Sequence, residues 1–284
     1  MQILLTGADG RLGSRLLQSL TARGHTVAGY DIATMDVTDG DAVRARLDDT
    51  RPELVIHCAA MTAVDQCAEN PDRALLVNGL GTQAVAQACL THGAAMLYIS
   101  TNEVFDGRET QPYSEYDRPN PINAYGRSKW VGEQVVRDLV PRHFIVRTAW
   151  LFAHGGGNFV HAVLRAAREG RPLRVVTNEI SSPTYADDLA DAIARLIETG
   201  RYGIYHLVNE GQVSRYGFAR QALDLAGYGD TPIEPIALAE YQRASQPPQY
   251  AALRNFAAAQ LGIRLRPWQD ALAAFIQAEG LQRA

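Results

Sequence analysis

Short apolar runs alternate with longer segments of helical periodicity through the first half of the chain. The short runs, rich in β-branched residues, predict strands, and the segments between them repeat apolar residues at the spacing of one helix face. This alternation is typical of a parallel sheet covered by helices, so we predict an α/β fold with a doubly wound sheet. The predicted strands are residues 3–6, 26–30, 54–57, 96–100 and 144–147.

The predicted helices of this half have recognisable ends. The first covers residues 12–22 and stops before Gly24. Asn70 and Pro71 supply a cap and a first-turn proline for a long helix that runs towards Leu90.

The pattern changes after about Trp150. A triple-glycine loop at 155–157 is followed by a helix over 159–168, a short strand at 173–176, a helix over 185–198 and an extended segment at 204–208. From Ser214 onward helix and loop alternate, interrupted by prolines. We expect residues 1–150 to form a dinucleotide-binding domain, which residues 184–210 rejoin with a further strand. Residues 151–183 and 211–284 would form a smaller C-terminal substrate-binding part.

Composition narrows the class of protein. The chain has 284 residues, 46% of them apolar, and a formal charge of −4, which predicts a compact soluble protein with one large and one smaller part. The negative balance argues against a nucleic-acid partner. Three cysteines without close spacing predict neither a disulfide framework nor a zinc site. With no leader sequence and no apolar stretch long enough for a membrane span, we expect a cytoplasmic protein.

A glycine motif follows the first strand and opens the first helix. Gly7, Gly10 and Gly13 have GxxGxxG spacing, and Arg11 and Leu12 lie between them. Gly7 permits a tight turn, Gly10 lets the backbone approach a pyrophosphate, and Gly13 allows the helix to pack closely on the strand. The exposed N–H groups at the start of the helix would receive the anion. This context favours a Rossmann-type dinucleotide site over an ordinary strand-to-helix turn.

Asp31 ends the second predicted strand, where a carboxylate can hold the hydroxyls of the adenosine ribose and would repel a 2′-phosphate. This favours NADH, although Arg11 in the glycine loop leaves NADPH open. Asp36 and Val37 are placed to contact adenine, and a capping turn before the next helix is the competing interpretation of Asp36.

Small residues follow the third predicted strand. Cys58, Ala59 and Ala60 would let the phosphate and ribose of a cofactor lie against the backbone. Cys58 has no paired base or positive cluster in the sequence around it, so we interpret it as a small buried residue rather than a reactive thiol.

Tyr125 and Lys129 have Tyr-x-x-x-Lys spacing at the start of a predicted helix, and Ser100-Thr101 closes the strand before it. One helical turn places the phenol and the ammonium on the same face. A nearby ammonium and an oxidised nicotinamide ring would lower the pKa of the phenol, so that Tyr125 could exchange a proton near neutral pH. Thr101 would hydrogen-bond the reacting oxygen.

With these motifs in place, the chain resembles the extended short-chain dehydrogenases/reductases, and among them the dTDP-4-dehydrorhamnose reductase family, over nearly its whole length. The resemblance implies reduction of a 4-keto group on a nucleotide-linked 6-deoxysugar by NADH or NADPH. It assigns catalysis to Thr101, Tyr125 and Lys129, further cofactor contacts to Thr62 and Asn78, and sugar contacts to Val64, Asn102 and Trp150. The matching segments are residues 3–7, 59–65, 78, 100–107, 121–129, 147–150, 158–159, 182–190, 261–262, 267–268 and 271–272.

Two departures from the family limit what can be carried over. Asn102 stands where the family often has an aspartate. Arg15 stands where some members have a glutamate used in a metal-linked dimer, so we expect no metal site, and a homodimer stays an open expectation.

Two other functions remain as alternatives. A nucleotide-sugar dehydratase or epimerase would have an acid and a base directly after Thr101, but Asn102-Glu103 keeps only the base, and an amide cannot protonate a leaving hydroxyl. A non-catalytic nucleotide-binding subunit would not need the complete set of Thr101, Tyr125 and Lys129.

Other polar residues have less specific interpretations. His154 and His161 flank the triple-glycine loop, where we expect solvated or helix-capping roles rather than shared metal ligation. Residues 112–115 would form either a loop that closes over substrate or ordinary surface. The cations available for a nucleotide diphosphate in the C-terminal part are Arg215, Arg243 and Arg254.

Overall fold

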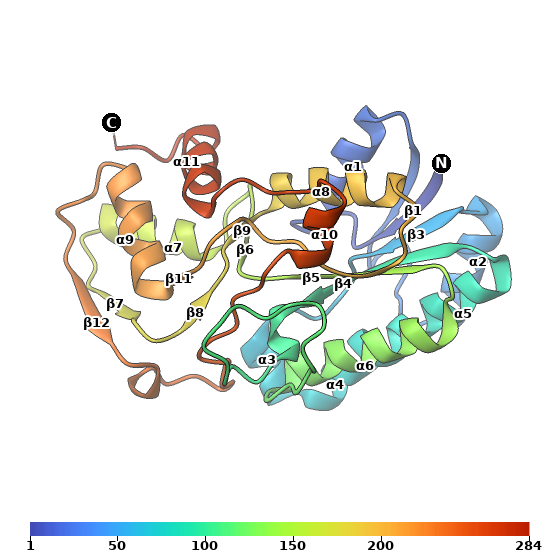
Figure 1. The fold of residues 1–284 in the computed structure, drawn as a ribbon, viewed down its shortest axis with the longest axis horizontal. Coiled ribbons are helices and arrows are strands. Elements are labelled where there is room, and N and C mark those ends of the chain that lie inside the picture. Colours follow the sequence, from blue (N-terminus) through green and yellow to red (C-terminus); the bar gives the residue numbers. More distant parts are fainter. Residues whose placement is uncertain (284) are drawn as a thin grey trace.

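The computed structural model describes residues 1–283. Its centre is a six-stranded parallel sheet in the order β10-β5-β4-β3-β1-β2 (Figure 1). This confirms the predicted α/β fold with a Rossmann-type sheet. The strands are β1 (Gln2–Thr6), β2 (Thr26–Tyr30), β3 (Leu54–His57), β4 (Ala95–Thr101), β5 (His143–Thr148) and β10 (Gly203–His206).

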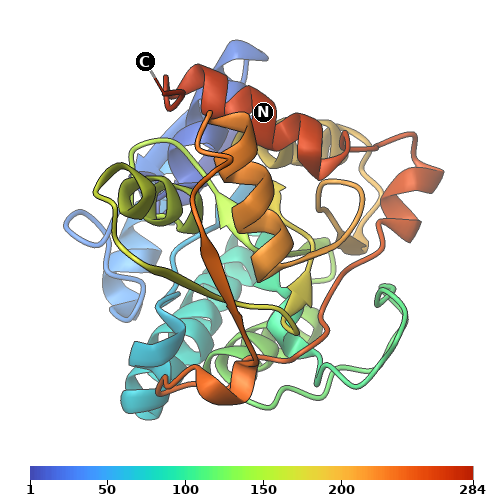
Figure 2. The same cartoon turned by 90° about the vertical axis from the view of Figure 1, so that its left-hand side faces the viewer.

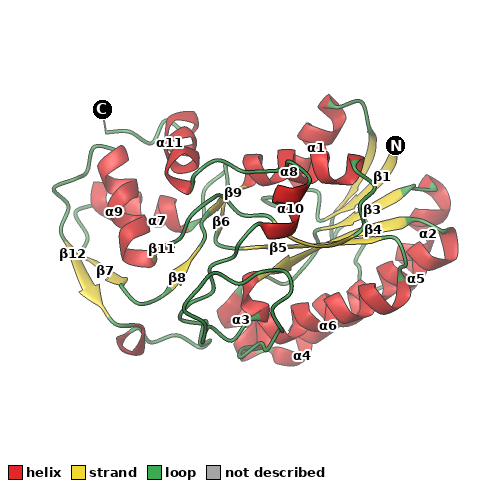
Figure 3. Cartoon of the chain, in the orientation of Figure 1, coloured by secondary structure: helices red, strands yellow, loops and turns green. Residues whose placement is uncertain are grey.

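Helices cover both faces of this sheet (Figures 1 and 3). Because successive side chains of a strand point to opposite faces, β1 contributes to two cores. Ile3 and Leu5 pack in the cluster that includes residues of α1 and α8, whereas Leu4 packs in the cluster that includes residues of α2 and α5. The covering helices are α1 (Gly13–Ala22) and α8 (Ala186–Glu198) on one face, and α2 (Gly40–Thr50), α5 (Thr82–His92) and α6 (Ala124–Leu139) on the other.

The long helix predicted from Pro71 is interrupted. The structure has a short α4 (Pro71–Leu75), a π-helical turn η1 (Leu76–Gly81) and then α5, while α3 (Val64–Glu69) precedes them. Asn70 and Pro71 occupy the predicted cap and first-turn positions, but the side chain of Asn70 accepts no capping hydrogen bond. A π turn is often found at a functional site, and here it contains Asn78.

A second packed region lies beside the sheet, and Figure 2 shows it from its own side. Its core is aromatic, with the ring centroids of Phe152 and Phe218 5.7 Å apart and those of Phe152 and Phe275 5.3 Å apart. Its helices are α7 (Phe159–Arg168), α9 (Arg215–Leu225) and α11 (Trp268–Ala278), and α10 (Phe256–Gln260) packs on the central sheet. The short strands are β6 (Leu151–Phe152), β7 (Leu173–Val176), β8 (Ile180–Ser181), β9 (Thr184–Tyr185), β11 (Val213–Ser214) and β12 (Ile233–Ile236).

The prediction of only helix and loop after Ser214 missed β12. This strand pairs in parallel with β7 in a two-stranded sheet and contains Pro235. A proline is tolerated in such an edge strand because its missing N–H can face away from the ladder.

No helix within residues 1–283 is long and apolar enough to cross a membrane. The three cysteines are all free thiols, and burial raises the pKa of Cys58 and of Cys89 to about 12.

Candidate active site

The glycine loop between β1 and α1 packs so closely that side chains would collide. Gly7 has φ +66°, and a Cβ there would lie 2.9 Å from the backbone nitrogen of Ala59. A Cβ on Gly13 would lie 2.0 Å from the carbonyl oxygen of Gly7. Within residues 1–283 the backbone N–H groups of Arg11 and Leu12 have no hydrogen-bond partner. The loop therefore offers free donors at the start of a helix, which is the arrangement that a pyrophosphate needs.

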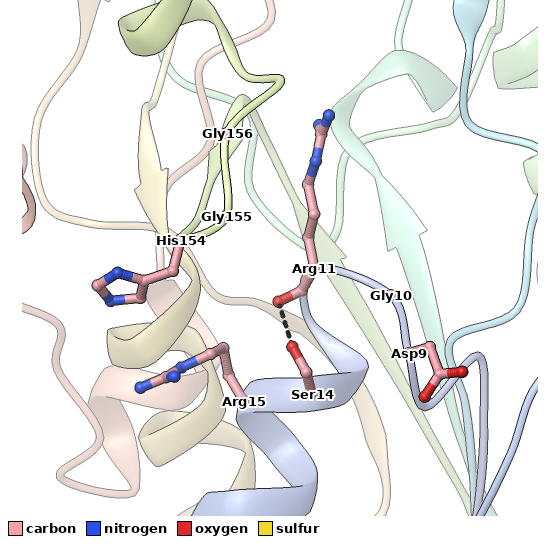
Figure 4. Close-up of a pocket in the computed structure, with 8 residues that line it drawn as sticks. All are labelled: Asp9, Gly10, Arg11, Ser14, Arg15, His154, Gly155 and Gly156. Carbon is pink, nitrogen blue, oxygen red and sulfur yellow. Dashed lines mark hydrogen bonds between the residues drawn. The ribbon is translucent and has the colours of Figure 1, made fainter. Parts of the chain in front are cut away.

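Asp31 and Arg11 extend from this region in different directions. Asp31, at the end of β2, accepts hydrogen bonds from the N–H of Asp9 at 3.0 Å and of Ile32 at 2.7 Å. The Arg11 guanidinium donates to the carbonyl oxygen of Gly157 at 2.6 Å, and Figure 4 shows its side chain extended along the triple-glycine loop and away from Asp9. As placed, Arg11 does not reach towards Asp31, where the 2′-phosphate of NADPH would lie.

The turn after β2 differs in detail from its prediction. Asp36 accepts from the N–H of Thr38 at 2.9 Å and from its hydroxyl at 2.8 Å, and these bonds lower the pKa of the carboxyl. Residues 36–39 form the turn before α2 that the competing interpretation predicts, and the side chain that caps the helix is that of Asp39. Val37 is buried against Gly81 of the π turn. An adenine contact by Asp36 or Val37 stays a prediction.

Asn78, to which the resemblance assigns a cofactor contact, is held by hydrogen bonds within the protein. Its side chain is 0% exposed and all of its hydrogen bonds are internal. The amide accepts from the N–H of Met61 at 2.8 Å and donates to the Met61 carbonyl at 3.0 Å and to the hydroxyl of Ser128 at 2.9 Å. The π turn thus directs Asn78 inward, where it fixes the segment of Ala60 and Thr62 relative to α6.

The three predicted catalytic residues come from β4 and the start of α6. Thr101 is buried at the end of β4, and Tyr125 and Lys129 occupy the first two turns of α6. Asn123 caps that helix by accepting from the N–H of Gly126 at 2.8 Å. The short turn at residues 102–104, directly after β4, touches the start of α6 through backbone, because a Cβ on Gly126 would lie 2.0 Å from the carbonyl oxygen of Glu103.

Burial shifts the pKa values of Tyr125 and Lys129, and the pKa of Tyr125 is raised rather than lowered as predicted. Burial raises the pKa of Tyr125, and the nearby Glu103 carboxylate raises it further, while a hydrogen bond with Thr101 acts in the opposite direction. Burial lowers the pKa of Lys129 to about 7, and its ammonium lies 4.1 Å from the ring centroid of Tyr98. The chain's own charges therefore do not produce the lowered phenol pKa that the Tyr-x-x-x-Lys spacing predicts.

A buried ion pair supports the same helix. Arg147 of β5 and Glu133 of α6 form two hydrogen bonds, at 2.9 and 2.7 Å, with side chains 1% and 0% exposed. The hydroxyl of Ser100, next to Thr101, donates to the same carboxylate at 2.5 Å. The composition of the chain gives no signal for this pairing, which joins three elements far apart in sequence.

The residues expected to meet the sugar come from separate segments of the chain. Asn102 donates to the hydroxyl of Ser181 at 3.1 Å and to the carbonyl of Ala251 at 3.1 Å, and it accepts from Thr101 at 3.2 Å. Only one acceptor position of its amide is left for a sugar. Val64 is half-buried at the start of α3. A sugar contact by Val64 or by Asn102 stays a prediction.

Trp150 belongs to a charged and aromatic cluster that the sequence only partly indicates. The Arg215 guanidinium lies 3.5 Å from the centroid of the Trp150 ring and 3.2 Å from a carboxylate oxygen of Glu179. Arg243 pairs with Asp65 of α3 at 2.9 Å. Sequence analysis missed Glu179 because its partner is 36 residues away along the chain.

Arg254 and the segment 112–115 make contacts within the protein. Arg254 lies over the ring of Phe256 at 5.1 Å. In the segment 112–115, Glu115 is buried and accepts from the N–H groups of His206 and Ala257, each at 3.0 Å. Glu115 therefore anchors this segment to the fold, and the expectation of a closing loop or plain surface is wrong for it.

The two histidines near the triple-glycine loop are neither solvated nor caps. His154 and His161 bind the two carboxylate oxygens of Glu279 at 2.6 and 2.9 Å, because α11 ends beside them. Arg15 pairs with Asp187 of α8 at 2.5 and 2.9 Å. A cavity of about 530 Å³ lies beside the glycine loop, and Figure 4 shows the residues that line it. It is lined by Asp9, Gly10, Arg11, Ser14, Arg15, His154, Gly155 and Gly156.

A Rossmann-type sheet with a glycine-rich first turn, together with a tyrosine and a lysine one helical turn apart beside Thr101, defines an extended short-chain dehydrogenase/reductase. Comparison with known families makes this more specific, since the family model for the RmlD substrate binding domain matches residues 1–280. The chain belongs to this family, which confirms its resemblance to the dTDP-4-dehydrorhamnose reductases.

Individual relatives match over almost their full length. The chain is 38% identical to the spore coat polysaccharide biosynthesis protein SpsK of Bacillus subtilis, covering 97% of each chain. It is 37% identical to the dTDP-4-dehydrorhamnose reductase of Mycobacterium tuberculosis, covering 98% of this chain and 93% of that one. The crystal structure of a dTDP-4-dehydrorhamnose reductase from Bacillus anthracis, in complex with NADP, superposes with a TM-score of 0.94 at 36% identity, covering 97% and 98% of the two chains.

Proposed function

We propose that the chain reduces the 4-keto group of a nucleotide-linked 4-dehydro-6-deoxysugar with NADH or NADPH, as in the conversion of dTDP-4-dehydrorhamnose to dTDP-rhamnose. The observation that carries this proposal is the contact between the end of β4 and the first turn of α6, which brings Thr101 and Tyr125 together. The names of the relatives and the NADP complex of one of them support the substrate and the cofactor.

The residues present fit a dinucleotide. Gly7 and Gly13 leave space that a Cβ would fill, and the free N–H groups of Arg11 and Leu12 can receive the pyrophosphate. Asp31 is placed for the adenosine ribose. The bound nicotinamide supplies the hydride.

The chain's own residues position the carbonyl and supply the proton. The Thr101 hydroxyl, which donates to Asn102 in this structure, would turn its proton towards the keto oxygen, and Tyr125 donates its phenolic proton to that oxygen as negative charge develops on it. A raised pKa keeps Tyr125 protonated at neutral pH, which suits a proton donor in the direction of reduction. Lys129 is held against Tyr98 and binds the ribose next to the nicotinamide, which fixes the cofactor relative to Tyr125.

Besides the cofactor, the proposed reaction needs a site for the nucleotide-linked sugar. Val64 and Trp150 would contact the sugar. Arg215, Arg243 and Arg254 are the cations predicted for its diphosphate, and the first two would have to be shared with Glu179 and Asp65. The cytoplasmic location and the homodimer remain predictions from the sequence.

The test is substitution of Tyr125 by phenylalanine. Because the proton donor is lost while the ring stays, turnover is expected to fall by about 100- to 10,000-fold with little change in cofactor affinity. Tyr116→Phe is the matched control, since Tyr116 is 79% exposed. Undiminished reductase activity of the Tyr125 variant would refute the assignment.

The same assay separates reduction from the dehydratase and epimerase alternatives. With NADPH and dTDP-linked 4-ketosugar, a reductase oxidises one NADPH for each sugar reduced, whereas the alternatives return the cofactor unchanged. Product formation without NADPH oxidation would replace the proposed function by one of these two. Tight cofactor binding without turnover on any ketosugar would instead favour a non-catalytic subunit.

A further inference from the structure

Glu103 is a carboxylate that the proposed reduction leaves without a task. It comes two residues after Thr101, whose hydroxyl accepts from the Glu103 N–H at 3.2 Å. One oxygen of its carboxylate, Oε2, accepts from the side chain of Asn123 at 2.6 Å. Its carbonyl oxygen lies against Gly126, directly after Tyr125. Glu103 is therefore fixed between the two elements that bring Thr101 and Tyr125 together.

Among the described residues, no cationic side chain pairs with the carboxylate of Glu103. Within residues 1–283 it makes no salt bridge, and its second oxygen, Oε1, has no hydrogen-bond partner. The two guanidiniums whose charge reaches it, Arg215 and Arg243, are paired with Glu179 and Asp65 instead.

The surroundings of Glu103 favour its protonated carboxyl more strongly than bulk water would. Burial raises the pKa of Glu103, the hydrogen bond from Asn123 counteracts this, and the charge of Glu179 raises the pKa further. A raised pKa makes the carboxylate of Glu103 a stronger base than a glutamate exposed to water.

We propose that Glu103 transfers protons in the same site, and that the chain also exchanges the hydrogen on a carbon beside the keto group of its sugar with solvent. This activity rests on the proposed function, because the keto oxygen would again be held by Thr101 and Tyr125. Hydrogen bonds to a carbonyl oxygen stabilise the enolate that forms when a proton leaves the neighbouring carbon.

The exchange balances without any further reactant. The carboxylate of Glu103 removes a proton from the carbon beside the carbonyl, the electrons of that C–H bond form a C=C bond, and the carbonyl π electrons move to oxygen. The carboxyl then exchanges its proton with water, and the reverse step returns a proton to carbon and restores the ketone. A single carboxyl returns the proton to the face from which it came, so the configuration at carbon is retained.

The experiment measures deuterium uptake without reduction. The full chain is incubated with NADP⁺ and dTDP-4-keto-6-deoxyglucose in D₂O, and the mass of the sugar nucleotide is followed over time. NADP⁺ completes the site but cannot reduce the ketone. The wild-type chain is expected to exceed the protein-free exchange rate by at least about tenfold, and Glu103→Gln to return it to about the protein-free rate.

Control variants separate this role from damage to the site. Glu109→Gln removes an exposed carboxylate of the next loop and is expected to exchange like the wild-type chain. Glu103→Asp keeps a carboxyl but withdraws it by one methylene, so part of the exchange should remain. Binding of the ketosugar to each variant is measured by calorimetry.

Three results would overturn the proposal. The first is a wild-type chain that reduces the ketosugar with NADPH but exchanges no faster than the protein-free sample. The second is exchange by a sugar-binding Glu103→Gln variant at the wild-type rate, and the third is inactivity of Glu103→Asp when it still binds the sugar. If the wild-type chain neither reduces nor exchanges the ketosugar, the proposed function itself fails.

Discussion

The buried pair of Arg147 and Glu133 gives the most quantitative prediction. Replacing Arg147 by methionine keeps most of the side-chain volume but removes both hydrogen bonds to Glu133. The carboxylate of Glu133 is 0% exposed, so water cannot replace the lost partner. Its remaining hydrogen bond comes from Ser100, and this cannot neutralise the charge.

Breaking a buried ion pair by removing one partner costs about 3–5 kcal/mol, whereas replacing both partners by apolar side chains is often neutral. We therefore expect Arg147→Met to lower the free energy of unfolding by about 3–5 kcal/mol. The double variant Arg147→Met with Glu133→Leu should recover most of that loss. The two substitutions are expected to be non-additive, because the loss of stability comes from the unpaired charge of Glu133 and not from the missing contact.

Urea denaturation followed by fluorescence measures both values. Arg137→Met on the exposed side of α6 is the matched control and should change stability by less than about 0.5 kcal/mol. If Arg147→Met costs less than about 1 kcal/mol, or if the double variant is no more stable than the single one, the buried charge is not what makes this pair important.

Two further predictions concern the cofactor loop and the end of α11. Gly13→Ala places a Cβ 2.0 Å from the carbonyl oxygen of Gly7 and should weaken NADPH binding by at least about tenfold in a fluorescence titration. The control Gly40→Ala, whose Cβ would lie 3.9 Å from its nearest atom, should leave the affinity unchanged. Equal affinities of the two variants would contradict the prediction that the glycine loop binds the pyrophosphate. Burial raises the pKa of Glu279 but its histidine partners, including His154, lower it more, so the net pKa lies below the usual value. The ionised form of Glu279 thus stabilises the fold at neutral pH, and this contribution is lost as pH falls through the lowered pKa. In thermal unfolding, Glu279→Gln should be less stable than the parent at pH 6 and nearly equal to it at pH 3. A difference that persists at pH 3 would count against an electrostatic origin.

Local sequence signals predict the fold well where they agree with the tertiary structure. Apolar runs locate the first five strands of the central sheet, and the glycine spacing locates the cradle between β1 and α1. The pattern around Tyr125 and Lys129 places both residues correctly at the start of α6. These features depend on neighbours a few residues apart, so the chain itself contains the information.

The features that the sequence does not predict depend on distant partners. Asn78 looks like any polar residue of a helix until Met61 and Ser128 are known to surround it. His154 looks solvated until Glu279, 125 residues later, is brought beside it. The pKa of Tyr125 also could not be judged from the spacing alone, because it depends on burial and on the carboxylate of Glu103, in the turn after β4.

The sixth strand has a consequence for how the chain folds during synthesis. β5 gains its neighbour β10 only after about 55 further residues have been added, and α8 arrives just before it. Until then a nascent chain exposes one edge of its sheet and the apolar residues that α8 later covers, including Leu5 and Leu16. A fragment ending near residue 150 would retain the cofactor and catalytic motifs but should aggregate, so any split or fusion of this chain should keep residues up to His206 in one piece with β1.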